Sequence, residues 1–199
     1  MGDHDNWAGP EQGAAAVSTG CIVDGHTLVD TPAGAVPAAS LGVGDIVVTF
    51  DDGPRRLRSV ERRPATGAGR MVLVPAGLIG NAEELLVMPD QRVIVESDVA
   101  EELTGSPFAV VPASALEAAE GVRRTRAARA RNLVSLAFVE DQAVTVAGGA
   151  VLVADGAAGM PCLLRASAAR YDPLDPVFVP EVVAALEEAS WEMGFAATA

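Results

Sequence analysis

The chain has 199 residues, of which 27 are acidic and 14 are basic, and its formal net charge at pH 7 is −13. Half of the residues are hydrophobic, so the chain can bury a core, and global disorder is excluded. The acidic balance repels phosphate backbones, which argues against a nucleic-acid partner. The apolar windows at 41–50 and 143–154 are far shorter than the roughly 20 residues of a membrane-spanning helix, so no membrane partner is expected.

Residues 1–20 are expected to form an irregular N-terminal arm. Gly, Pro, Ala and polar residues follow one another there without a sustained period. Acidic residues stand near the start, where a secretory signal peptide would carry positive charge. No signal peptide is predicted, and the expected location is the cytoplasm or a virion.

Residues 21–158 have the pattern of an all-β domain. Short β-branched runs, separated by Gly, Pro and Asp, recur about every ten residues, which is typical of a sandwich or barrel. The runs that predict strands are 27–29, 45–50, 56–62, 71–74, 85–87, 92–95, 108–111, 133–138, 143–146 and 150–153. Pro and Gly at 31–34 and 51–54 predict hairpin turns. A short helical segment is expected within 103–119, with Ser114 as its candidate N-cap.

Residues 159–199 are predicted to form a linker and a C-terminal helix. Pro180 fits the first turn of that helix. Its apolar stripe, recurring at helical spacing, consists of Val182, Leu186, Ala189 and Met193. We expect the helix to dock on its own domain, while Trp191 and Phe195 leave open the alternative that it binds a partner.

Several ordered motifs carry a resemblance to a known family. Residues 21–34 contain a Cys, a short apolar and Gly stretch, and then Thr-x-Val-x-Thr-Pro-x-Gly. Residues 41–54 read Leu-x-x-Gly-Asp-x-Val-x-Thr-x-Asp-x-Gly-Pro, and further blocks follow up to about residue 155. In these blocks the chain resembles the Hint family, the Hedgehog and intein self-processing module, and in particular its bacterial branch. The resemblance implies a flattened all-β fold of two intertwined, pseudo-symmetric halves.

The same resemblance implies a nucleophile. In active Hint domains the first Cys attacks the carbonyl of the preceding residue and converts the peptide bond into a thioester. That reaction also needs proton transfer at the departing amide nitrogen and donors for the oxyanion. Cys21 is therefore the candidate nucleophile, and Gly20 is the residue before the candidate scissile bond.

The proton-transfer motif of the family is degenerate in this chain. The family has Thr or Ser, and three residues later His, where this sequence has Met88 and Gln91. Neither side chain exchanges a proton near neutral pH. The bacterial branch also tends to carry His at the positions of Ser135 and Asp141. We therefore expect Cys21 to be a vestigial nucleophile, retained as a small buried apolar residue.

Two substitutes for the missing base remain open. One is His26, five residues after Cys21, and the other is an aspartate, Asp90 or Asp141. In the plainer interpretation His26 lies in a solvated turn and both acids lie on the surface. Whether Cys21 pairs with Cys162 is also open. No metal or cofactor site is predicted, because the two His and two Cys lack ligand spacing.

Two functions fit these observations. The first is a non-processing Hint-fold protein with a structural or interaction role, whose N-terminal arm and C-terminal helix bind protein partners or other copies of the chain. A component of a phage-like particle or other oligomeric assembly would suit this architecture. The second is a self-cleaving protein in which Cys21 performs an N-to-S acyl shift after Gly20. The incomplete catalytic motif favours the first function over an enzyme.

Overall fold

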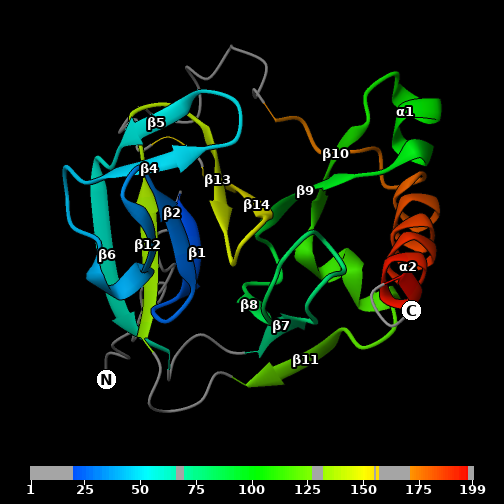
Figure 1. The fold of residues 1–199 in the computed structure, drawn as a ribbon, viewed down its shortest axis with the longest axis horizontal. Helices are drawn as coiled ribbons and strands as arrows, with labels where there is room; N and C mark the ends of the chain where they lie inside the picture. Colours follow the sequence, from blue (N-terminus) through cyan, green and yellow to red (C-terminus); the bar gives the residue numbers. More distant parts are fainter. Residues whose placement is uncertain (1–19, 66–69, 127–131, 155, 157–170, 197–199) are drawn as a thin grey trace, which may run out of the picture.

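The computed structural model describes residues 20–65, 70–126, 132–154, 156 and 171–196 (Figure 1). Its strands are β1 (Cys21–Asp24), β2 (Leu28–Thr31), β3 (Gly34–Pro37), β4 (Ile46–Thr49), β5 (Gly53–Arg56), β6 (Ser59–Pro64), β7 (Arg70–Val74), β8 (Leu85–Val87), β9 (Arg92–Glu96), β10 (Phe108–Pro112), β11 (Arg123–Arg126), β12 (Asn132–Ala137), β13 (Gln142–Val146) and β14 (Ala150–Ala154). Its helices are η1 (Ala38–Ser40), α1 (Asp98–Thr104), η3 (Ala113–Ala118) and α2 (Val179–Ala196). The predicted arm before Gly20 and most of the predicted linker lie outside the described residues.

The strands form two antiparallel sheets. The six-stranded sheet has the order β11-β7-β8-β1-β12-β6. The eight-stranded sheet follows the order β10-β9-β14-β13-β2-β3, and β4 joins it through β13 and pairs with β5. The chain passes repeatedly from one sheet to the other, so each sheet combines early and late segments (Figure 1). The predicted all-β fold of intertwined halves with a C-terminal helix is confirmed.

All ten predicted runs coincide with strands, and both predicted turns are confirmed. Residues 31–34 join β2 to β3, and the turn at 50–52 joins β4 to β5. The prediction did not include β1, β3, β5 and β11. The last three are short and mostly exposed, with Gly, Pro or Arg in place of an apolar run, so hydrophobic periodicity does not mark them.

The short helical segment expected within 103–119 is present as the 3-10 helix η3, but it takes up only part of that stretch. The stretch also contains the end of α1 and the strand β10. β10 pairs with β9 over its whole length, because its apolar residues fit a buried sheet position. Ser114 is not an N-cap. Pro112 holds that position, and the Ser114 amide donates to the carbonyl of Pro89 at 2.9 Å.

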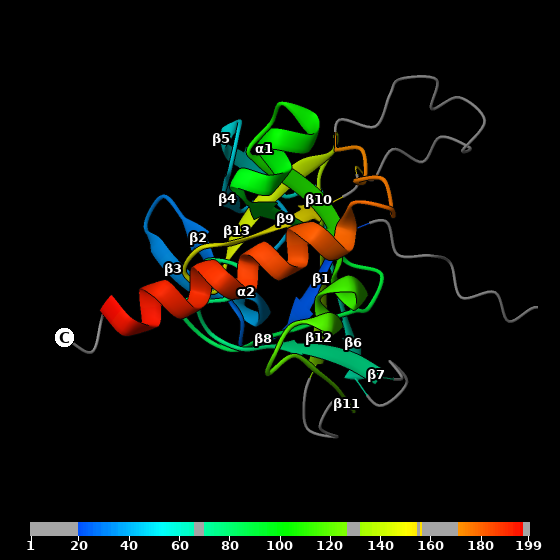
Figure 2. The ribbon, with the colours of Figure 1, turned by 90° about the vertical axis from the view of Figure 1, so that its right-hand side faces the viewer.

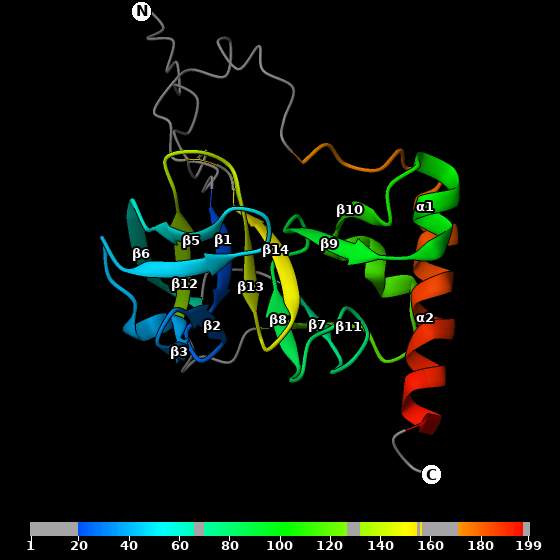
Figure 3. The same ribbon diagram turned by 45° about the horizontal axis from the view of Figure 1, so that its top comes forward.

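Helix α2 is part of the domain's own core. Val182, Val183 and Leu186 are buried. They belong to the same apolar cluster as the buried side chains of the strands. The helix packs against α1 and η3 and runs along one side of the domain (Figures 2 and 3). Docking of the helix on its own domain is thus confirmed, but Ala189 is exposed and Val183 takes its place in the buried face. The side chains from residue 191 onward, including those of Trp191, Met193 and Phe195, lie outside the described residues.

The segment before α2 is hydrogen-bonded along its path to the eight-stranded sheet and to its β4–β5 turn. The Tyr171 hydroxyl donates to Asp51 Oδ2 at 2.5 Å, and Arg92 Nη1 donates to the Tyr171 carbonyl at 2.8 Å. The Leu174 amide donates to the carbonyl of Val110 in β10 at 2.8 Å. These bonds direct the chain across the sheet edge toward α2.

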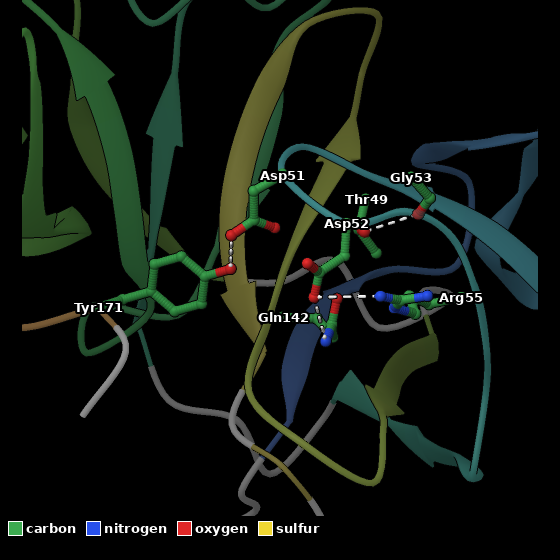
Figure 4. A network of polar contacts seen from close by, with 7 residues as sticks. All are labelled: Thr49, Asp51, Asp52, Gly53, Arg55, Gln142 and Tyr171. Atoms are coloured by element: carbon green, nitrogen blue, oxygen red, sulfur yellow. Dashed lines mark hydrogen bonds and ion pairs between the residues drawn. The ribbon is translucent and has the colours of Figure 1, made fainter. Parts of the chain in front are cut away.

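The β4–β5 turn receives one of these bonds and is itself fixed by polar contacts (Figure 4). Thr49 Oγ1 donates to the carbonyl of Gly53 at 2.6 Å. Asp52 accepts from Gln142 Nε2 at 3.1 Å and lies 3.6 Å from the Arg55 guanidinium. The two aspartates of this turn are therefore structural residues.

The burial of α2 predicts that it stabilises the domain. We expect Val182→Ala to lower the free energy of unfolding by about 1–3 kcal/mol, because it removes methyl groups from a fully buried site and leaves a cavity. Val177→Ala is the matched control, since Val177 is 73% exposed, and should change stability by less than about 0.5 kcal/mol. Urea titration of both variants measures the difference. Equal stabilities would show that α2 is not part of the cooperative core.

Candidate functional site

Cys21 begins β1, an interior strand of the six-stranded sheet, and has no exposed surface. It pairs with Leu136 in β12 and packs in the main apolar cluster. It is a free thiol, and burial raises its pKa from 9.0 to about 12. Since the thiolate is the reactive form of cysteine, this environment keeps the sulfur protonated and unreactive at neutral pH.

Gly20 lies against β12 with no room for a side chain. A Cβ at this position would lie 2.7 Å from Ser135 Oγ and 2.8 Å from the carbonyl oxygen of Leu136. The second contact is with backbone, which cannot move aside without shifting the strand. Ser135 therefore stands directly beside the residue that precedes Cys21, where the resemblance expects a histidine.

Residues 88–91 form the tight connection between β8 and β9. The Gln91 amide donates to the carbonyl of Met88 at 3.0 Å, and the turn is held against η3 by the bond from Ser114 to Pro89. Met88 is partly buried and packs against the small apolar cluster that includes Ile22. Asp90 points outward and is exposed. Residues 88–91 thus lie against the beginning of β1.

The Gln91 side chain is buried and makes hydrogen bonds at both ends. Its Oε1 accepts from the backbone amide of Ile22 at 3.0 Å. Its Nε2 donates to the carbonyl of Val153 at 2.7 Å and to that of Arg92 at 3.1 Å. Gln91 is therefore one residue away from the Gly20–Cys21 peptide, and it joins β1 of one sheet to β14 of the other.

The two substitute bases are placed elsewhere. The His26 side chain is 82% exposed, beyond the far end of β1, and its Nδ1 lies 3.0 Å from Asp24 Oδ1. Asp141 Oδ1 accepts from the Gly156 amide at 2.7 Å and so closes the loop after β12. Neither His26 nor the exposed Asp90 is positioned to take a proton from Cys21.

The described part of the chain contains neither a candidate metal site nor a candidate membrane-spanning helix. No group of three or more His, Cys, Asp or Glu residues gathers there in a way that could hold a metal ion. None of its helices is long and apolar enough to cross a membrane. The open question of a Cys21–Cys162 pair involves Cys162, which lies outside the described residues.

Comparison with known proteins identifies the family. The family model of the Hint domain matches residues 21–152, about two thirds of the chain, and the chain therefore belongs to the Hint domain family. Among solved structures it is similar to the bacterial intein-like domain from Clostridium thermocellum, with 16% identity, a TM-score of 0.45, and coverage of 68% of this chain and 99% of that one. No curated protein matches the chain.

Two inteins are also similar to the chain in structure. A splice-inactive variant of the AceL NrdHF class 3 split intein has 14% identity and a TM-score of 0.43, with 69% of this chain and 98% of that chain covered. The MchDnaB-1 intein has 13% identity and a TM-score of 0.40, with 65% and 98% covered.

The partners of Gln91 are the part of the site that sequence reasoning missed. Ile22 and Val153 contribute only backbone atoms, and they lie 69 and 62 residues away from Gln91. No side-chain motif marks such contacts. The available signal is a single amide side chain directly before the apolar strand 92–95, which indicates a buried polar group that needs partners.

The Gln91 bonds predict a large cost for losing the amide. We expect Gln91→Leu to destabilise the protein by about 2–4 kcal/mol, because the Ile22 amide and the Val153 carbonyl would be left buried without partners. Asp90→Asn, one residue away and exposed, is the control and should be nearly neutral. Thermal or urea unfolding measures both variants. A loss below about 0.5 kcal/mol for Gln91→Leu would contradict the bonding described.

The burial of Cys21 predicts an inert thiol. In a Cys162→Ser background Cys21 is the single cysteine, and at pH 8 its thiolate fraction in the folded protein should be about a thousandfold lower than in the unfolded chain. Modification by a disulfide reagent should therefore be slow under native conditions and fast in urea. Rapid native modification near pH 8 would show that the thiol is accessible and activated.

Proposed function

We propose that this Hint domain does not process itself and acts as a stable module that binds a protein partner. The single observation that carries the proposal is the Gln91 side chain, whose amide is hydrogen-bonded to three backbone groups. We assign this residue to the position at which the family has its histidine. A group in that setting holds the start of β1 in place and has no proton to exchange.

The surroundings of Cys21 support the same proposal. Thioester formation would require the thiol to lose its proton, and its raised pKa opposes that step. The departing amide nitrogen would then need a proton donor. Met88 offers none, and His26, the one histidine among the described residues, is exposed and bonded to Asp24. Both ends of the proton transfer therefore lack a suitable group.

The surface supports a binding role. Several large apolar side chains are at least 40% exposed, namely Val43, Ile46, Phe50, Phe108, Val139 and Val177. Of these, Phe50 and Phe108 contact each other, and exposed apolar groups that lie together are typical of protein interaction sites. Participation in a phage-like particle or other assembly is a narrower form of this proposal, and measurement of the native protein's mass in solution by light scattering tests it. A monomer under all conditions would count against self-assembly.

Self-cleavage is the second candidate, favoured by one observation. The Ser135 hydroxyl stands beside Gly20, the residue that precedes Cys21. Loss of general acid–base catalysis typically slows a reaction by about 10²–10⁴, which would leave slow cleavage measurable.

Intact-mass analysis decides between the two candidates. We expect purified protein to keep its full mass during prolonged incubation with hydroxylamine or dithiothreitol, because no thioester forms for these reagents to open. A fragment beginning at Cys21, absent from a Cys21→Ala variant, would overturn the proposal.

Restoring the family motif tests the assignment of the site. The double variant Met88→Thr, Gln91→His should cleave after Gly20 faster than the unmodified chain, because it returns a hydroxyl and an imidazole to the turn beside β1. The same double variant with Cys21→Ala is the control and should remain intact. Circular dichroism must show a folded double variant. Absence of any gain in a folded protein would contradict the placement of Met88 and Gln91 at the former catalytic positions.

A further inference from the structure

A groove of about 580 Å³ lies between the β9–β10 hairpin, the loop at 77–80 and helix α2. Figure 2 shows α2 crossing this side of the domain, next to α1 and β10. Small residues on two sides keep the groove open, with Gly77 and Gly80 on the loop and Ala185 and Ala189 on the helix. None of the residues at the Gly20–Cys21 site lines it, so the groove is separate from the site described above.

Two aromatic rings form an apolar wall of the groove. Phe50 follows β4 and Phe108 begins β10, and both line the groove although they are 46% and 40% exposed. Their ring centroids are 5.1 Å apart with an interplanar angle of 77°, an edge-to-face arrangement. This geometry leaves an electron-rich ring face available to a ligand, and cations bind favourably to such faces.

The charged residues that line the groove are all acidic. Glu96 at the end of β9, Asp98 at the start of α1 and Glu188 on α2 approach it from three elements. No arginine is among the lining residues, and the chain contains no lysine. The groove therefore has a negative potential that favours a cationic occupant.

Ser97 adds an unsatisfied hydrogen-bonding group to the wall of this groove. It lies between Glu96 and Asp98, is 9% exposed and lines the groove. Its Oγ has no hydrogen-bond partner among the described residues, and it does not cap α1 although it occupies the N-cap position. Buried hydroxyls are normally paired, whereas this unpaired oxygen lies directly behind the part of the groove wall that Glu96 and Asp98 form.

We propose that this groove binds an arginine-bearing segment of a protein partner. The guanidinium stacks on the aromatic wall and donates to the carboxylates of Glu96, Asp98 and Glu188, while apolar neighbours in the segment cover Phe50 and Phe108. Arginine fits better than lysine, because its planar group has five N–H donors and stacks on rings. The inference deepens the proposed binding role. It does not depend on whether Cys21 reacts, so either proposal can fail without the other.

A labelled peptide of alternating Arg and Leu residues tests the proposal by fluorescence anisotropy. A second peptide with citrulline in place of arginine keeps the shape and removes the charge. We expect the arginine peptide to bind the full chain, to bind more weakly at high salt, and to bind at least about fivefold more tightly than the citrulline peptide.

Variants of the chain test whether the arginine peptide binds in the groove. Glu96→Gln combined with Glu188→Gln should weaken binding of the arginine peptide by about fivefold or more, and Phe108→Ser should also weaken it. The matched control is Glu61→Gln combined with Glu140→Gln, which makes the same charge change at exposed residues that do not line the groove, and it should stay within about twofold of the unmodified chain. Circular dichroism verifies that each variant is folded.

Several results would overturn the proposal. They are no binding of the arginine peptide at millimolar concentration, equal binding of the citrulline peptide, or an equal loss of affinity in the control variant. Self-association in analytical ultracentrifugation that Glu96→Gln and Glu188→Gln abolish would assign the groove to a second copy of the chain. That outcome would also refute the partner proposed here.

Discussion

The side chain of Gln91 is the interaction on which the arrangement of the two sheets at the candidate site depends. It accepts a hydrogen bond from β1 and donates one to β14, so a single amide connects the central part of one sheet to the other. Inside an apolar core each of these backbone groups would otherwise be unpaired. A histidine has one ring nitrogen to accept and one to donate in its neutral form, whereas an amide can donate twice. The glutamine amide therefore keeps a fixed set of hydrogen bonds and exchanges no proton.

The fold could be predicted further than the site, and the difference has a physical reason. Apolar runs such as 85–87 and 150–153 mark strands, because strands in the core must bury apolar side chains. The family motifs predicted the fold from the sequence alone. β11 and β5 were missed since their residues are exposed arginine, glycine or proline, and only pairing with β7 and β4 makes them strands. At the site, the family resemblance predicted that Cys21, Met88 and Gln91 belong together, but the bonds of Gln91 to backbone atoms required the three-dimensional structure.

Charge is distributed unevenly over this acidic protein. The strands β5 and β6, at one end of the domain in Figure 1, are rich in arginine, while α1 and α2 at the other end carry mainly acidic residues. Some of the arginines serve the fold directly: Arg56 donates to the carbonyl of Gly44 and Arg62 to those of Ala39 and Leu41. The groove beside α2 is therefore acidic because of α1, α2 and the end of β9, and the net charge of the chain strengthens that local potential at long range.

The pairing of β1 with β12 has a consequence for biosynthesis. β1 is among the first described segments to leave the ribosome, yet one of its two neighbours, β12, begins at Asn132, and α2 completes the core from Val179 onward. Contacts of such long sequence separation slow folding, because a large loop must close before any of them forms. The nascent chain thus carries an apolar β1 that lacks this neighbour until residues 132–137 have been made. Chaperone binding to this segment would protect it from aggregation until translation has passed α2.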